Sequence, residues 1–121
     1  MYTIDQVQKI LSEVADEIPA EFYEKLNGGV VLLEQAKPHP DSRGDLYIMG
    51  EYCHNAMGRT VFIYYGSFMR HFGEAPEELL RRELRETLRH ELTHHWESLA
   101  GDKDLEIEDA RQLWAYRNRK K

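Results

Sequence analysis

The chain has 121 residues, of which 41% are hydrophobic and 31% are charged. This length suits one domain spanning residues 1–121 and leaves no room for a multidomain assembly. With 16 basic and 22 acidic residues the formal charge is −6, which repels phosphate backbones and anionic lipid headgroups. We therefore expect one globular domain that binds neither nucleic acid nor membranes.

The sequence predicts a cytoplasmic protein. No run approaches the roughly 18 apolar residues of a membrane span, and the first ten residues, MYTIDQVQKI, lack the apolar run of a signal peptide. The single cysteine, Cys53, has no partner within the chain for a disulfide, which fits a reducing compartment. The sequence indicates no particular oligomeric state.

The first third of the chain predicts two helices and a strand. Apolar residues recur at helical spacing over 4–17, after Thr3 and Gln6, which form the pattern of a capping box. A proline at the start of 19–26 favours a second, short helix, and the Asn-Gly-Gly that follows ends it. The segment 30–33 is then expected to be a short buried strand.

The middle of the chain predicts an antiparallel hairpin. Segment 36–45 contains two prolines and a glycine and is expected to be a loop. Strands are expected over 46–53 and 60–65, and residues 54–59 between them are too few for a parallel crossover. Segment 66–73 is interpreted as a connection.

A long helix is expected from Pro76 to about Ala100, with Gly101 ending it. Asp102 or Asp104 can then cap a final helix. Together these elements predict an α+β fold, in which a small, mainly antiparallel sheet packs against helices.

The most informative residues are the H-E-x-x-H sequence from His90 to His94, inside the long helix. Residues four apart on a helix lie ~40° apart around the axis and ~6 Å along it, so both imidazoles can converge on one ion. Two neutral imidazole nitrogens suit zinc. Glu91 lies beside the expected ion, where its carboxylate can reach a water molecule as a general base.

The rest of the helix divides into an apolar and a polar side. A spine of leucines lies opposite the histidine pair, at positions 84, 88, 92 and 99. Glu83, Thr87 and Glu97 line the histidine side, which is expected to be the wall of a polar cleft. His95 falls on the leucine side and is interpreted as a packed histidine bonded through one nitrogen.

A catalytic zinc site needs a third protein ligand, and the sequence offers more than one. Glu97 is the nearest in-line carboxylate, although it lies a full turn beyond His94. Asp109 is the alternative, because a chain that turns back after Gly101 could deliver it to the ion.

The chain resembles the bacterial minimal zincin-like metallopeptidases. The resemblance rests on His90-Glu91-Leu92-Thr93-His94-His95 and on three further segments, residues 26–30, 45–52 and 58–66. It implies an α+β fold in which the H-E-x-x-H helix faces a small sheet, a zinc ion, and peptide hydrolysis. Many relatives continue the motif with x-x-G-x-x-D, where this chain has Glu97 and Ala100, so the third ligand stays open.

We therefore expect a zinc metallopeptidase that acts on a peptide or protein, with His90 and His94 as ligands and Glu91 as the base. The alternative is a non-catalytic metal-binding or protein-interaction module that retains this helix. Five residues could chemically stabilise an oxyanion, although no pattern favours one of them: His54, Tyr64, Tyr65, His71 and Tyr116.

Overall fold

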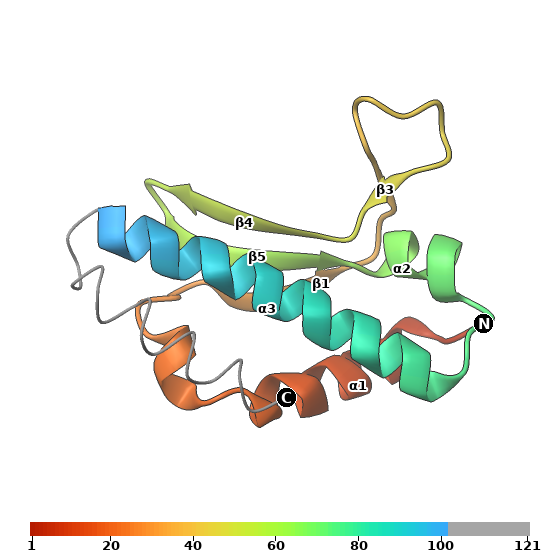
Figure 1. Cartoon of the computed structure of the whole chain (residues 1–121), viewed down its shortest axis with the longest axis horizontal. Coiled ribbons are helices and arrows are strands. Elements are labelled where there is room, and N and C mark those ends of the chain that lie inside the picture. Colours follow the sequence, from red (N-terminus) through yellow and green to blue (C-terminus); the bar gives the residue numbers. More distant parts are fainter. Residues whose placement is uncertain (102–121) are drawn as a thin grey trace.

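The computed structural model describes residues 1–101, which fold as helices around a small sheet (Figure 1). The α-helices are α1 (Ile4–Glu17), α2 (Tyr65–Phe72) and α3 (Glu77–Gly101), and one 3-10 helix, η1, spans Ala20–Tyr23. The strands are β1 (Gly29–Leu33), β2 (Lys37–Pro38), β3 (Tyr47–Ile48), β4 (Gly50–Asn55) and β5 (Gly58–Tyr64). The predicted α+β class is confirmed.

The main sheet has the strand order β1-β5-β4, so β5 is central and β4 lies at an edge. Strands β4 and β5 pair antiparallel, as predicted, and β2 and β3 form a second antiparallel pair that projects from the body beside α2 (Figure 1). The pairing of β1 with β5 is parallel. The strands over 30–33 and 60–65 were both predicted, but their parallel pairing was not, since the direction of pairing across a long connection leaves no local pattern.

The β4–β5 hairpin is tighter than expected. A turn of two residues, Ala56 and Met57, joins the strands, and Gly58 takes a φ of 127° that favours glycine. The first of the two strands begins at Gly50 and not at residue 46, because Tyr47 and Ile48 pair with β2 instead. The segment 36–45, expected to be a loop, therefore contributes a two-residue strand.

The prediction of a connection over residues 66–73 is wrong, because this segment forms helix α2. This helix places Phe68 and Met69 in the core, where they are 0% and 8% exposed. It is shorter than the segments in which helical periodicity stands out, which is why the sequence did not predict it. Gly66 lets it pack closely, since a Cβ there would lie 2.5 Å from the main-chain nitrogen of Ala36.

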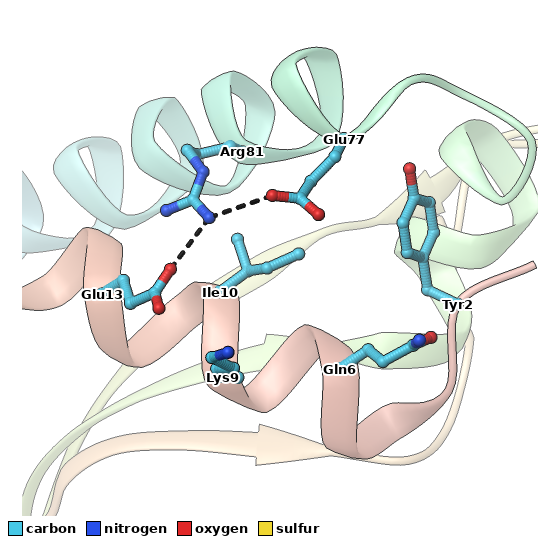
Figure 2. Close-up of a pocket in the computed structure, with 7 residues that line it drawn as sticks. All are labelled: Tyr2, Gln6, Lys9, Ile10, Glu13, Glu77 and Arg81. Carbon is cyan, nitrogen blue, oxygen red and sulfur yellow. Dashed lines mark hydrogen bonds and ion pairs between the residues drawn. The ribbon is translucent and has the colours of Figure 1, made fainter.

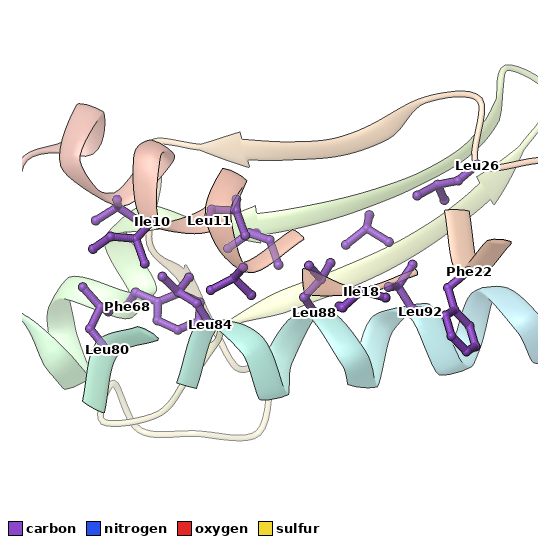
Figure 3. Close-up of a cluster of buried hydrophobic side chains, with 14 of the residues drawn as sticks. Ile10, Leu11, Ile18, Phe22, Leu26, Phe68, Leu80, Leu84, Leu88 and Leu92 are labelled. Atoms are coloured by element: carbon purple, nitrogen blue, oxygen red, sulfur yellow. The ribbon is translucent and has the colours of Figure 1, made fainter. Parts of the chain in front are cut away.

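One hydrophobic core lies between α1, α3 and the sheet (Figure 3). The predicted leucine spine of α3 is fully buried, with Leu84, Leu88 and Leu92 at 0% exposure. Helix α1 supplies Val7, Ile10, Leu11 and Val14, and β5 supplies Val61 and Ile63. This packing holds α3 across one face of the sheet and sets the helix beside β4.

The predicted start of α1 is confirmed, since Thr3 and Gln6 form a reciprocal capping box. The second predicted helix is the short 3-10 helix η1. In the part of the chain that the structure describes, no helix is long and apolar enough to cross a membrane. The predicted final helix after Asp102 lies outside the described residues.

Candidate metal centre on helix α3

His90 and His94 project from the same face of α3 and meet through their Nε2 atoms, which are 3.1 Å apart. The ring centroids are 4.6 Å apart and the rings are nearly perpendicular. Two nitrogens at ~2.1 Å from one ion, at a tetrahedral angle, lie about 3.4 Å from each other. The separation of the pair is therefore close to that of two zinc ligands.

The described residues do not complete a metal site. Among residues 1–101 no three His, Cys, Asp or Glu side chains are grouped closely enough to hold an ion. The histidine pair fits two positions of a zinc site, and a third ligand must be added by another group.

Glu97 lies next to the pair but on the far side of one ring. Its Oε1 is 3.3 Å from Nδ1 of His94, the nitrogen that points away from His90. The structure thus brings Glu97 to a ligand and not to the position between the two Nε2 atoms. Asp109, the alternative third ligand of the sequence analysis, lies outside the described residues.

Glu91 is the buried carboxylate of the site, with only 7% of its surface exposed. Burial raises the pKa of Glu91, while His90, His94 and a hydrogen bond from the main-chain N–H of Tyr52 act against that rise. The carboxylate is thus held between the histidines and β4. A carboxylate whose pKa is raised by burial is suited to accept and return a proton near neutral pH.

A groove runs between α3 and the edge strand β4, with Gly50, His90 and Glu91 in its wall throughout. One end is a hollow of about 320 Å³ that Met49 and Thr87 also line. The other is a hollow of about 500 Å³ that Ile48, Tyr52 and His94 also line. A cleft thus lies on the histidine side of the helix, with β4 as its second wall; of the three residues expected to line it, Thr87 does so, and Glu83 and Glu97 do not.

Gly50 is a groove residue that the sequence analysis missed. A Cβ at Gly50 would lie 2.8 Å from Cγ2 of Thr87 and 3.3 Å from Cγ of Glu91, so β4 can approach α3 only with glycine here. A glycine has no side chain to signal such a role, and only the paired strand and helix reveal it.

Tyr52, also missed, ties β4 to α3 through a buried hydrogen-bond chain. His95 is 0% exposed and its Nε2 donates to the carbonyl of Glu24 at 2.7 Å. Its Nδ1 then accepts from the Tyr52 hydroxyl at 3.0 Å, and that oxygen accepts from Arg59 at 3.1 Å. His95 is packed, as predicted, but both of its nitrogens are bonded and not one.

The candidate oxyanion residues are dispersed. Tyr64 donates to Glu51, and Tyr65 donates to the main-chain carbonyl of Tyr2. His71 lies on α2 with its ring against Tyr47. His54 is on β4, where its Nδ1 lies 3.3 Å from Ser98 Oγ, and Tyr116 lies outside the described residues.

A further hollow of about 410 Å³ lies between α1 and the first turns of α3 (Figure 2). Arg81 spans it, reaching Glu13 of α1 at 2.8 Å and Glu77 of its own helix at 3.2 Å. The charges that line this hollow are thus largely matched within the protein.

Comparison with known proteins places the chain in a family. Residues 30–114 match the sequence profile of the zincin-like metallopeptidases, so the match covers the sheet and all of α3. The chain belongs to the zincin-like metallopeptidase family.

A solved structure is similar to the chain in sequence and in fold. A conserved hypothetical protein from Thermo thermophilus is 34% identical, with a TM-score of 0.72 over 84% of this chain and 100% of that one. No curated protein matches the chain. The resemblance noted from the sequence motifs is confirmed at the level of the family.

Proposed function

We propose that this protein is a zinc-dependent metallopeptidase that hydrolyses peptide bonds in the groove between α3 and β4. The observation that carries the proposal is the convergence of His90 and His94 beside a buried Glu91. Family membership supports the same class of chemistry. A metal-binding module without catalysis would need no buried carboxylate beside the histidines.

In this proposal His90 and His94 hold zinc through Nε2, and a further carboxylate, for which Asp109 is the remaining candidate, completes the ligand set. Zinc, when bound, supplies a Lewis acid that polarises a carbonyl and lowers the pKa of water. Glu91 accepts the proton of the attacking water and returns it to the leaving amine. The N–H of Tyr52 keeps the Glu91 carboxylate turned toward the groove.

The substrate in this proposal is an extended peptide or protein segment. Among the described strands β4 pairs with β5 alone, so its other edge faces the groove. An extended segment can pair with such an edge through main-chain hydrogen bonds, whatever its side chains, at groups other than the Tyr52 N–H, which already donates to Glu91. Strand β5 is central in the sheet, so the edge available next to the groove is that of β4. The cytoplasmic location stays a prediction.

Two substitutions separate metal binding from chemistry. Glu91→Gln keeps the shape of the side chain and removes the base, so we expect one zinc per chain by elemental analysis and no turnover. His94→Ala removes a ligand, and we expect loss of both. Cleavage is assayed by mass spectrometry on a mixture of unrelated peptides, with zinc-loaded wild type as the reference.

Each result tests one part of the proposal: the base, the peptidase activity or the place of the metal. Cleavage by purified Glu91→Gln at the wild-type rate would exclude Glu91 as the base. A wild-type protein that holds one zinc yet cleaves no peptide in the mixture would overturn the peptidase and favour the non-catalytic module. Zinc retained by His94→Ala would place the metal elsewhere.

A further inference from the structure

The contact between Glu97 and His94 favours one tautomer of a neutral His94. Glu97 Oε1 lies 3.3 Å from Nδ1 of His94. A carboxylate only accepts hydrogen bonds, so the proton of this contact belongs to Nδ1 of His94. Because a neutral imidazole has a single N–H, Nε2 carries the lone pair, and Nε2 is the atom that faces His90 at 3.1 Å.

We propose that Glu97 is a positioning residue that holds His94 as a zinc ligand without binding the ion itself. This inference rests on the zinc site of the proposed function. A carboxylate on the Nδ1–H of a ligating imidazole fixes the tautomer, limits rotation of the ring and strengthens Nε2 as a donor. Glu97, one turn beyond His94, is placed to do all three.

A direct ligand would be placed differently. The carboxylate of Glu97 lies at the side of the imidazole opposite the His90 contact, whereas a ligand would have to share the region between the two Nε2 atoms. The absence of a three-residue metal cluster among residues 1–101 agrees with this arrangement.

A purely stabilising role also fits poorly. The side chains of His94 and Glu97 are 48% and 68% exposed. Polar contacts between such exposed side chains contribute little to the free energy of unfolding. Water screens the interaction, and holding two side chains in place costs conformational entropy. Removal of Glu97 should therefore change metal affinity much more than it changes the melting temperature of the protein without metal.

The test measures zinc affinity by competition with a chromophoric chelator. We expect Glu97→Ala to weaken binding by roughly 10- to 100-fold, and Glu97→Gln to weaken it less, since an amide oxygen still accepts a hydrogen bond. The matched control is Glu83→Gln, which removes the same charge two helical turns from His90. Its zinc affinity should stay within about 2-fold of the wild-type value, because salt largely screens a charge that lies ~10 Å from the metal ligands.

Cobalt(II) distinguishes an orienting residue from a ligand, because its visible spectrum reports the number and type of ligands. We expect wild type and Glu97→Ala to give the same cobalt spectrum and the same melting temperature in chelator. An altered spectrum in Glu97→Ala would make Glu97 a ligand and overturn the proposal. Unchanged zinc affinity in Glu97→Ala would overturn it as well.

These outcomes are independent of catalysis. A wild-type protein that binds zinc but cleaves no peptide would refute the proposed function, and the affinities would still decide the role of Glu97. A wild-type protein that binds no zinc would refute both.

Discussion

The hydroxyl of Tyr52 donates a hydrogen bond to Nδ1 of His95 at 3.0 Å, which joins the edge strand β4 to the buried side of α3. The same tyrosine donates its main-chain N–H to Glu91 on the groove side of that helix. One residue thus holds the strand against both the core and the candidate base. The position of Glu91 relative to β4 depends on this double attachment.

Tyr52→Phe should destabilise the protein by about 1–3 kcal/mol, because His95 Nδ1 is left buried without its donor. The measurement is urea unfolding in excess chelator, so that metal binding does not contribute. Tyr47→Phe, on the projecting hairpin, is the matched control and should change the unfolding free energy much less. Equal effects of the two substitutions would show that the Tyr52–His95 bond adds nothing to stability.

The pKa of His95 is lowered, chiefly by burial; the hydrogen bond to the Glu24 carbonyl opposes this fall, and the charges of Arg59 and His54 add to it. At a pH above 6.5, the ordinary pKa of histidine, the imidazole is neutral in both the folded and the unfolded chain. Under these conditions the burial of His95 carries no penalty from a lost charge. As the pH falls below 6.5, the unfolded chain takes up a proton that the folded one resists, so stability is lost with acid.

His95→Gln removes the pH-dependent contribution of His95 to stability. The difference in unfolding free energy between wild type and His95→Gln, measured in chelator, should shrink as the pH falls from about 7.5 toward about 5.5. The slope approaches at most about 1.4 kcal/mol per pH unit for one proton. His71→Gln, at an exposed position, is the control. A difference that stays constant with pH would contradict the assigned cause.

The sequence predicted the elements whose patterns are local. The capping box of α1, the leucine spine of α3 and the β4–β5 hairpin depend on residues close together in the chain, and all are confirmed. Helix α2 was missed because eight residues give too few helical repeats. The parallel β1–β5 pair joins residues 29–33 to 60–64, and no short pattern encodes such pairing.

The residues of the candidate site also fall into two groups, those that a local sequence pattern predicts and those that depend on tertiary contacts. His90, Glu91 and His94 share one helix, so their spacing alone predicted their convergence. Gly50 and Tyr52 come from another element, and their roles depend on tertiary contacts with Glu91 and His95. The position of Glu97 was expected on the correct face, but which nitrogen it would meet depended on rotamers that spacing does not determine.

Glu17 and Arg85 join α1 to α3 through two contacts, at 2.7 and 3.2 Å. The hydrogen bond from Arg85 is the main reason that the pKa of Glu17 lies below 4.5. The contribution of this pair to stability is therefore complete above pH 4.5 and is lost as the pH falls below it. Because the Glu17 side chain is 44% exposed, the contribution is expected to stay under about 1 kcal/mol.

Glu17→Gln tests this contact by acid titration of the folded state. The variant should be slightly less stable than wild type at about pH 7 and should approach it below pH 4.5. Salt at ~1 M should reduce the difference at neutral pH, since the screening length falls to ~3 Å. A difference that grows as the pH falls would reverse the assigned sign.

Gly50→Ala should disturb the groove between β4 and α3. The new Cβ would lie 2.8 Å from Cγ2 of Thr87 and 3.3 Å from Cγ of Glu91, so β4 and α3 must separate. Overpacking of this kind costs about 1–3 kcal/mol. Zinc affinity should change little, because both histidines lie on α3, whereas any peptidase activity should fall as Glu91 loses its contact with β4.

Thr87→Ser removes the methyl group that the new Cβ would meet most closely. In the double variant Gly50→Ala/Thr87→Ser we therefore expect the urea unfolding free energy to recover toward that of Thr87→Ser alone. Gly101→Ala is the control for glycine replacement, since no atom of residues 1–101 is found within 4 Å of a Cβ there. A double variant no more stable than Gly50→Ala would mean that Thr87 does not set the spacing between β4 and α3, and that the contacts at 3.3 Å with Glu91 and Ile63 limit the added methyl group instead.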